Sequence, residues 1–262
     1  MGKFKWFGSP NISEISAMHY FKLWFRSLLL LGALALYIFA RITGTFSALD
    51  AVEKRPALLG FIWLVFAIEM LFRFFPSHLE SMGCQKQFAR NERPTGNPLP
   101  KDKNNRSAGY VALAWLALTG LIGLVYRIGW IDEAILFLIC LAFSVCDMIC
   151  ILFFCPFQTW FMKNKCCGSC RIYNWDYAMM FSPLIFTPSF YTWSLLALSL
   201  ALLVRWEITY WRHPERFYEV TNESLKCAFC KEKLCSHKRQ LQRFLKKRLQ
   251  SLRIQGNHEH NG

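Results

Sequence analysis

Residues 177–204 read YAMMFSPLIFTPSFYTWSLLALSLALLV, a long apolar run that contains Pro183 and Pro188. As a single helix, this run would cross a membrane once and leave its two flanking segments on opposite sides. Bent near Thr187–Ser189, it would instead form a helical hairpin that returns the chain to the side it left. The two interpretations give different topologies, so this stretch decides how the chain is folded.

Four other apolar blocks precede this run, each of about 20 residues, the length that crosses roughly 30 Å of hydrocarbon as a helix. Hydrophobic residues make up 54% of the 262-residue chain, and its charged residues, with a formal net charge of +14, fall mainly between the blocks. A soluble domain would spread its apolar residues over one core rather than gather them in blocks. We therefore expect membrane spans at about 23–42, 57–75, 109–126 and 133–154.

The distribution of Lys and Arg distinguishes the two topologies, because short basic loops stay in the cytoplasm. With the hairpin, most basic residues share one side, and the opposite side keeps only Arg41, Lys54, Arg55 and Arg127. With a single crossing, the basic residues divide far more evenly. The hairpin is therefore favoured, with both termini cytoplasmic. Its first arm, residues 177–187, is too short to cross alone, so we expect it to be re-entrant and covered by other helices.

The predicted fold class is all-α: a polytopic transmembrane helical bundle of four spans plus the Pro-bent helical hairpin, over residues 1–211. Residues 212–262 form a cytosolic Cys-rich tail that ends in a basic amphipathic segment. Such a segment favours the anionic inner leaflet of a cell membrane, so its expected partner is lipid and not nucleic acid. The polar, Pro- and Asn-rich composition of residues 77–108 predicts an irregular or mobile loop between the second and third spans.

Two cysteine clusters flank the 177–204 run. Residues 155–176 read CPFQTWFMKNKCCGSCRIYNWD, and residues 227–237 read CAFCKEKLCSH. Each contains a Cys-x-x-Cys spacing, and two such pairs are typical of a four-thiolate metal site. The predicted ligands are Cys167, Cys170, Cys227 and Cys230, with Cys155, Cys166, Cys235 and His237 as further candidates.

Four thiolates in tetrahedral geometry suit zinc, and the same number also holds an iron–sulfur cluster. Neighbouring basic residues such as Lys163, Lys165 and Arg171 would lower the pKa values of the thiols and favour the thiolate. Two other interpretations remain open. The cysteines could be ordinary cytoplasmic thiols, or, if the topology were reversed, they could form disulfides.

Cys155-Pro156, followed by a short basic link and Cys166-Cys167-Gly-Ser-Cys170, resembles the cytoplasmic Cys-Pro segments of polyferredoxin-type membrane subunits in anaerobic respiratory chains. The resemblance covers about twenty residues and implies an iron–sulfur centre. The repeated Cys-x-x-Cys-x-x-Cys-x-x-x-Cys-Pro runs of those proteins are absent from this chain.

Glu69 and Arg73 lie four residues apart on the second predicted span, and Asp147 lies inside the fourth. Such residues are costly at this depth and often functional. If the two helix faces meet, Arg73 could serve both carboxylates, or one carboxylate could carry a proton. The structural alternative, which we favour, is a Glu69–Arg73 ion pair, with Asp147 hydrogen-bonded to Ser144 or a neighbour. Other residues of the fourth span, Cys140, Cys146 and Cys150, are interpreted as packing residues.

The predicted function is a multi-pass membrane redox component whose cytosolic thiolate site exchanges electrons with a redox protein or a membrane quinone. Haem is disfavoured, because no histidine lies within a predicted span. A second class is a zinc-stabilised membrane scaffold or assembly protein. A third is a transporter that uses the Pro-interrupted hairpin at its binding site.

Overall fold

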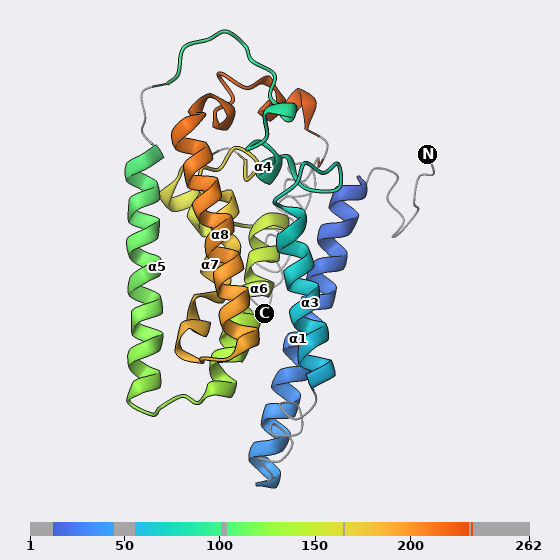
Figure 1. Cartoon of the computed structure of the whole chain (residues 1–262), viewed down its shortest axis with the longest axis vertical. Coiled ribbons are helices and arrows are strands. Elements are labelled where there is room, and N and C mark those ends of the chain that lie inside the picture. Colours follow the sequence, from blue (N-terminus) through green and yellow to red (C-terminus); the bar gives the residue numbers. More distant parts are fainter. Residues whose placement is uncertain (1–12, 45–55, 101–103, 165, 231, 233–262) are drawn as a thin grey trace, which may run out of the picture.

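The computed structural model describes residues 13–44, 56–100, 104–164, 166–230 and 232. Throughout these residues the regular elements are helices, and no strand forms. The long helices stand side by side in Figure 1, so the all-helical prediction is confirmed. They are α1 (Glu14–Thr43), α3 (Pro56–Phe72), α5 (Asn104–Arg127), α6 (Glu133–Leu152) and α8 (Phe190–Arg212).

Short helical elements connect the long ones. The first group lies between α3 and α5 and consists of α4 (Met82–Gln85) and η1 (Ala89–Asn91). The second group lies between α6 and α8: η2 (Phe157–Phe161), η3 (Tyr173–Trp175), α7 (Asp176–Phe181) and η4 (Ser182–Phe186). The third group follows α8: η5 (Pro214–Phe217), η6 (Glu223–Leu225) and η7 (Cys227–Phe229).

Local sequence explains where several long helices begin and end. Asp132 caps α6 by accepting a hydrogen bond from the Ile135 N–H at 2.9 Å. Ser189 caps α8 in a reciprocal arrangement with Thr192, which satisfies backbone donors that the first turn leaves unpaired. At its C-terminus α1 stops at Gly44, whose φ of 64° is readily adopted only by a residue without a side chain.

Four of the described helices, α1, α5, α6 and α8, are long and apolar enough to cross a membrane. The agreement with the predicted spans is incomplete. The second predicted span corresponds to α3, an apolar helix of 17 residues that is shorter than the four helices of spanning length. The returning arm of the predicted hairpin is α8, which has 23 residues and a spanning length of its own.

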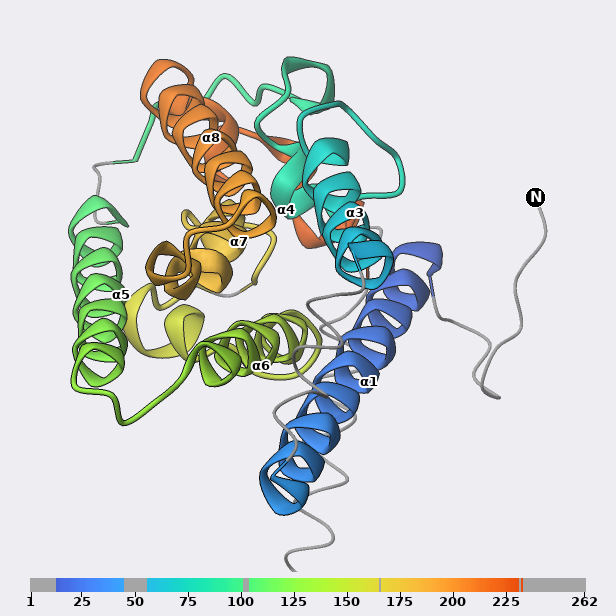
Figure 2. The ribbon, with the colours of Figure 1, turned by 60° about the horizontal axis from the view of Figure 1, so that its bottom comes forward.

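The chain reverses direction between η4 and α8, close to Pro188. The outgoing arm is short, because α7 holds six residues and η4 five, and α8 then packs back along both. Figure 2 shows α7 and η4 between α6 and α8, with α5 on the outer side. This approach is close: a Cβ on Gly123 of α5 would lie 2.2 Å from the ring of Phe186, so only glycine fits there.

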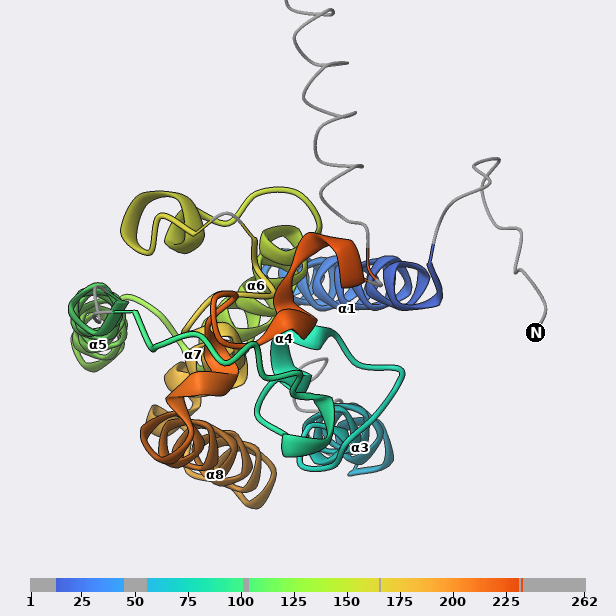
Figure 3. The ribbon, with the colours of Figure 1, turned by 90° about the horizontal axis from the view of Figure 1, so that it is seen from above.

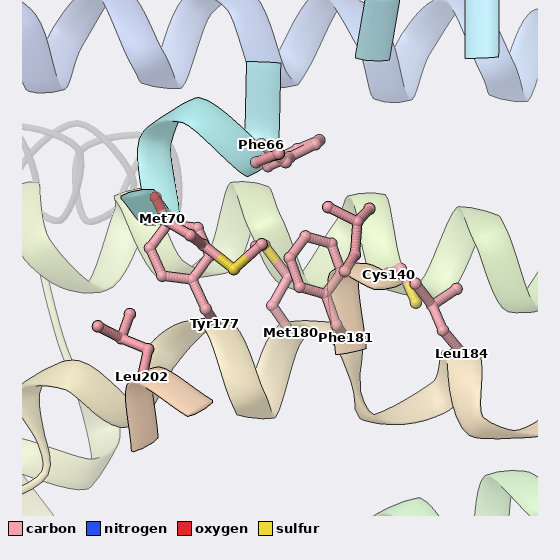
Figure 4. Packing of buried hydrophobic residues seen from close by; sticks show 10 residues of the cluster. Phe66, Met70, Cys140, Tyr177, Met180, Phe181, Leu184 and Leu202 are labelled. Atoms are coloured by element: carbon pink, nitrogen blue, oxygen red, sulfur yellow. The ribbon is translucent and has the colours of Figure 1, made fainter. Parts of the chain in front are cut away.

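The main apolar core forms around this short arm. Phe66 of α3 meets Phe181 of α7 edge to face, with ring centroids 5.4 Å apart, and Figure 4 shows both beside Met180. Leu202 of α8 and Cys140 of α6 complete the packing from the other two sides. The outgoing arm is therefore enclosed by α3, α6 and α8, and Cys140 has the packing role expected from the sequence.

At one end of the molecule, which we call the loop end, the segments 77–100, 157–175 and 213–230 lie together (Figure 3). Residues 77–108 were predicted to form an irregular or mobile loop. Residues 77–100 are mainly irregular, whereas residues 104–108 belong to α5. The segment after α8 contacts the 77–100 segment. Pro94 pairs with Asn222 in an isolated bridge, and the Glu223 N–H donates to the Arg93 carbonyl at 2.8 Å. The composition alone could not show this, because the partner lies more than a hundred residues further along the chain.

Candidate functional site

A buried ion network joins three long helices below the loop end. At its centre is Arg26 of α1, which is 1% exposed. Its Nη2 donates to Glu69 Oε2 of α3 at 2.7 Å, and its Nη1 donates to Asp147 Oδ2 of α6 at 3.1 Å. The same Nη1 also donates to the Ser144 carbonyl at 3.1 Å. One guanidinium therefore connects α1, α3 and α6, and it uses the planar, multi-donor geometry that lysine lacks.

The sequence had assigned the role of cation to Arg73, and the structure places that side chain elsewhere. Arg73 Nη1 lies 2.7 and 2.6 Å from the two carboxylate oxygens of Asp176 and donates to Asn174 Oδ1 at 3.1 Å. It also stacks on the ring of Tyr177, 4.5 Å from the centroid. Neither the Arg73–Glu69 pair nor an Arg73 that bridges Glu69 and Asp147 is formed. The physical reason is that α3 ends at Phe72, so Arg73 leaves the helical spacing that would align it with Glu69.

Further contacts extend this network toward the loop end. Lys22 of α1 lies between two carboxylates, with its Nζ 3.8 Å from Glu69 Oε1 and 3.6 Å from Glu80 Oε1. The Tyr177 hydroxyl donates to Glu69 Oε2 at 2.9 Å. Burial alone would raise the pKa of Glu80, but the positive charges of Arg73 and Lys22 outweigh it and hold this pKa below its usual value. The network is thus a chain of alternating charges rather than an isolated pair.

His19 lies one helical turn before Lys22 on α1 and is 5% exposed. Within the described part of the chain, neither of its ring nitrogens has a hydrogen-bond partner. The sequence placed His19 only near the cytoplasmic boundary, before the predicted first span that begins at about residue 23, and did not connect it with the charged residues. A buried imidazole without partners is costly, so its place beside the network is a feature of the site rather than of general packing.

A cavity of about 260 Å³ opens beside the network. Its wall contains five cysteine side chains: Cys146, Cys150, Cys155, Cys167 and Cys170. Two network carboxylates, Asp147 and Asp176, also line it. The remaining wall is largely apolar and includes four aromatic side chains and two thioethers: Trp115, Phe143, Phe157, Tyr173, Met179 and Met180. Sulfur and acidic groups therefore share one apolar chamber, which the sequence did not predict for Cys146 and Cys150.

Three of these thiols occupy one corner of the cavity, near the end of α6. Cys150, Cys155 and Cys167 line this corner. The Cys167 Sγ lies 2.7 Å from Gln158 Oε1 and 3.8 Å from the Cys150 carbonyl oxygen. The Gln158 N–H lies 3.4 Å from the Cys155 Sγ. The helix α6 ends at Leu152, and the segment that follows it adds Cys155, Gln158 and Cys167 to the cavity wall.

The loop with Cys166, Cys167 and Cys170 folds around a buried lysine from a distant part of the sequence. Lys86, which is fully buried, donates from its Nζ to the carbonyls of Gly168 at 3.0 Å and Cys170 at 2.7 Å. Its Nζ also lies 5.4 Å from the ring centroid of Trp206. Burial lowers the pKa of Lys86 to about 7. The two contacts of Lys86 therefore help to fix the course of this loop.

The sequence predicted that neighbouring cations would lower the pKa values of the thiols. Two buried thiols at the loop end have raised pKa values instead. Burial raises the pKa of the Cys170 thiol, although Lys86 opposes this effect. Burial also raises the pKa of Cys84, which lies on α4. Both side chains are removed from water, and desolvation disfavours the thiolate more than nearby positive charge favours it. At these two positions the thiol form predominates.

The predicted metal ligands are distributed over two parts of the loop end. Cys167 and Cys170 line the cavity, whereas Cys227 is exposed and Cys230 is half-buried, both in the segment after α8. Cys235 and His237 lie outside the described residues. Among the residues that are described, no three or more His, Cys, Asp or Glu side chains are arranged to hold a metal ion. The four-thiolate site stays a prediction from the sequence.

The fold and the site together define a class: an all-helical protein with spanning-length helices, a buried ion network and a cysteine-lined cavity. No protein-family model matches the chain, and no curated protein or solved structure matches it either. The function must therefore be argued from the site itself.

Proposed function

We propose that this chain is a multi-pass protein of the cell membrane that carries electrons through sulfur groups at its cytosolic side. The observation that carries the proposal is the cavity, in which five cysteines lie beside two carboxylates of the buried ion network. Cysteine sulfur is the redox-active group among common side chains, either as a thiol or as a ligand of an iron–sulfur cluster. Electron transfer is the chemistry that this gathering of sulfur supports best.

Proton transfer accompanies many electron transfers, and the network supplies groups for it. Asp147 has one face on the cavity and a carboxylate oxygen paired with Arg26, which links it to Glu69. Buried carboxylates in membrane segments commonly form proton relays. In the proposed function, Asp147 exchanges protons with the cavity, and Glu69 forms the next step of the relay.

The proposed orientation places both termini and the loop end in the cytoplasm. Among the described residues, four helices have the length and composition to cross a membrane. The chain reversal at Pro188 returns α8 to the end from which α7 departs, so residues 166–170 and 227–230 both lie at the loop end (Figure 1). Most of the basic residues belong to segments on this side of the proposed orientation, as the positive-inside rule requires. The basic tail would then meet the anionic inner leaflet.

The test is a redox and metal measurement on protein purified without oxygen. Iron, zinc and acid-labile sulfide are measured per chain, a visible spectrum is recorded, and the protein is titrated reversibly with dithionite and ferricyanide. Iron with sulfide and a reversible change in absorbance would support a cluster, with Cys167, Cys170, Cys227 and Cys230 as its first candidate ligands. Reversible loss of titratable thiols without metal would support thiol chemistry. A protein that neither takes up nor releases electrons would contradict the proposal.

A second function, a membrane scaffold, is favoured by the way the segment after α8 is attached. Arg216 donates from its Nε to Glu92 Oε2 at 3.0 Å, and Ser224 donates to the Asn91 carbonyl at 2.7 Å. These contacts position the tail as a fixed platform for a partner. Stoichiometric zinc in a protein without redox activity would favour the scaffold. Metal-independent solute binding would instead favour a transporter that uses the interrupted α7–η4 arm.

A further inference from the structure

The cavity contains one carboxylate oxygen that the ion network does not use. Arg26 donates to Asp147 Oδ2 at 3.1 Å, and among the described residues no hydrogen bond reaches Asp147 Oδ1. The Asp147 side chain lines the cavity and is 15% exposed. Asp176, the other carboxylate of the wall, is fully engaged, because Arg73 donates to both of its oxygens and the Tyr177 N–H donates to Oδ1 at 2.9 Å. Asp147 Oδ1 is therefore a strong hydrogen-bond acceptor that is open to a ligand.

The same wall offers few hydrogen-bond donors. Trp115 Nε1 already donates to Ser182 Oγ at 3.1 Å. Gln158 Nε2 donates to the Asn164 carbonyl at 2.9 Å. The Tyr173 hydroxyl is buried and does not reach the surface of the cavity. The thiols of the wall are weak donors, and an ionised carboxylate only accepts hydrogen bonds. The cavity therefore favours a ligand that donates a hydrogen bond over one that only accepts.

A substituted benzene ring fits the volume and the lining of the cavity. A cavity of about 150 Å³ already holds benzene, and this one has about 260 Å³. The ring of Trp115 lies 5.0 Å from that of Phe143 and 6.1 Å from that of Phe157, by centroids, so these three form one aromatic part of the wall. Such a wall packs well against another ring. Pockets of this kind use a few polar groups to orient an apolar ligand.

The cavity opens beside a helix of spanning length. Cys146 lies in the second half of α6, is exposed and lines the cavity, which places an opening at this residue. The helix α6 has the length and composition to cross a membrane. In the proposed orientation this opening faces lipid, so a ligand dissolved in the membrane reaches the cavity without passing the loop end.

We propose that this cavity binds the head group of a membrane hydroquinone, with one ring hydroxyl donating to Asp147 Oδ1 and the ring packed against Trp115. The geometry selects a lipid-soluble ring that carries a hydroxyl donor, and the choice of a redox-active ring rests on the proposed redox function. A quinone has a similar ring but only carbonyl acceptors, so it should bind more weakly than its hydroquinone. Hydrogen bonding to Asp147 thus distinguishes the reduced form from the oxidised form.

The test uses the reduced full-length protein in detergent without oxygen, with durohydroquinone as the probe. Equilibrium dialysis should give one bound durohydroquinone per chain. Durene and the dimethyl ether of durohydroquinone keep the methylated ring, one with less volume and one with more, but both lack the hydroxyl donors. Each should bind about tenfold or more weakly than durohydroquinone, because a hydrogen bond to a charged group is lost. Equal binding of the three compounds would reduce the interaction to apolar partitioning and overturn the inference.

Alkylation of the cysteines locates the probe in the unchanged protein. At a free concentration of about ten times its Kd, durohydroquinone should slow the reaction of Cys146 with N-ethylmaleimide by roughly five- to tenfold, because most sites are then occupied. Cys227 is exposed and lies outside the cavity, so it should keep its rate. Peptide mass spectrometry measures both rates in one sample. Unchanged reactivity of Cys146, or equal slowing of both cysteines, would overturn binding in the cavity.

Two variants separate the hydrogen bond from the aromatic wall. Asp147→Asn keeps the size of the side chain but removes its charge, so the preference for durohydroquinone over its dimethyl ether should fall to about threefold or less. Trp115→Leu should weaken the binding of both compounds by roughly three- to tenfold and keep the preference. Asp132→Asn is the matched control, because Asp132 caps α6 outside the cavity and asparagine caps a helix equally well. An unchanged preference in Asp147→Asn would contradict the assigned contact.

Failure of this inference is distinguishable from failure of the proposed function. If durohydroquinone leaves Cys146 unprotected while dithionite and ferricyanide still titrate the protein reversibly, the inference is wrong and the redox function stands. If durohydroquinone binds as expected to a protein that neither takes up nor releases electrons, the redox function is wrong and the site for a hydroxyl-bearing ring stands without it. The protection of Cys146 is measured in the unchanged protein, so this result does not depend on whether the variants fold.

Discussion

The Arg26 guanidinium of α1 is hydrogen-bonded to the Asp147 carboxylate of α6 at 3.1 Å, although the two residues are 121 positions apart in the sequence. The same side chain pairs with Glu69 of α3 at 2.7 Å. Removing a buried ion from water costs several kcal/mol, and this cost is recovered only when its partners are well placed. The pairing therefore specifies how α1, α3 and α6 are positioned, even if its net contribution to stability is small.

The first prediction concerns this cation. Arg26→Met should lower the free energy of unfolding by about 3–5 kcal/mol, because it leaves two buried carboxylates without their partner. Thermal unfolding in detergent checks the change. Arg41→Met is the control, since the Arg41–Asp132 pair is exposed and its loss should leave the melting temperature almost unchanged. The triple variant Arg26→Met, Glu69→Gln, Asp147→Asn should recover part of the loss; no recovery would contradict the ion-pair explanation.

A second prediction concerns the pH dependence that Lys86 imposes. Its folded pKa of about 7 lies well below the value of about 10.4 for an unfolded lysine. Between these pH values the unfolded chain binds a proton that the folded protein does not, so stability rises with pH over this window. The slope approaches about 1.4 kcal/mol per pH unit in the middle of the window.

The measurement for Lys86 is the difference in unfolding free energy between the unchanged protein and Lys86→Met, from pH 7 to pH 10. Other titrating groups are common to both proteins and cancel in the difference. The variant should lack the contribution that rises with pH. A difference that stays constant over this range would show that Lys86 is protonated in the folded state throughout.

The third prediction concerns Asn222, which is fully buried and attaches the segment after α8 to the 77–100 segment. Its side chain accepts from the Arg93 N–H at 3.1 Å and donates to the Arg216 carbonyl at 2.9 Å. Asn222→Ala should make the chain beyond Arg212 much more sensitive to limited proteolysis, since buried backbone groups lose their partners at a cost of about 1–3 kcal/mol each. Glu219→Gln is the matched control. An unchanged digestion pattern for Asn222→Ala would mean that other contacts hold this segment.

The fourth prediction concerns topology. The loop end should be cytoplasmic, and the C-terminal end of α1 should face the opposite side. In a background without other cysteines, Thr43→Cys should react with an impermeant maleimide in intact cells, whereas Cys227 should react only after the membrane is opened. Labelling of Cys227 in intact cells would contradict the proposed orientation and would make disulfides a leading account of the cysteine clusters.

Local features of the sequence determined the helices and the chain reversal. Asp132 and Ser189 are N-cap residues that precede apolar runs, and Pro188 disfavours a continuous helix through residues 177–204. These effects act over a few residues, so they can be recognised without knowledge of the fold. The second span was less well predicted, because the sequence does not show that α3 ends at Phe72.

Only the tertiary structure decided which charges pair. Spacing along one helix favoured Glu69 with Arg73, but the end of α3 turns Arg73 toward Asp176 and leaves Glu69 to Arg26. The choice depends on which helix faces meet, and this depends on packing across the whole molecule. Lys86 illustrates the same point, since nothing near it in sequence indicates that two carbonyls of the 166–170 loop will surround its ammonium.

For the cysteines, too, the sequence and the tertiary structure determined different things. Composition and Cys-x-x-Cys spacing drew attention to both clusters, because those signals are local in the sequence. The cavity that brings Cys150 and Cys155 beside Asp147 and Trp115 exists only because α5, α6 and the short arm enclose it. The sequence by itself therefore determined that two cysteine clusters and apolar segments of spanning length occur in one chain. The fold decided which sulfurs meet, because that depends on contacts between residues far apart in the chain.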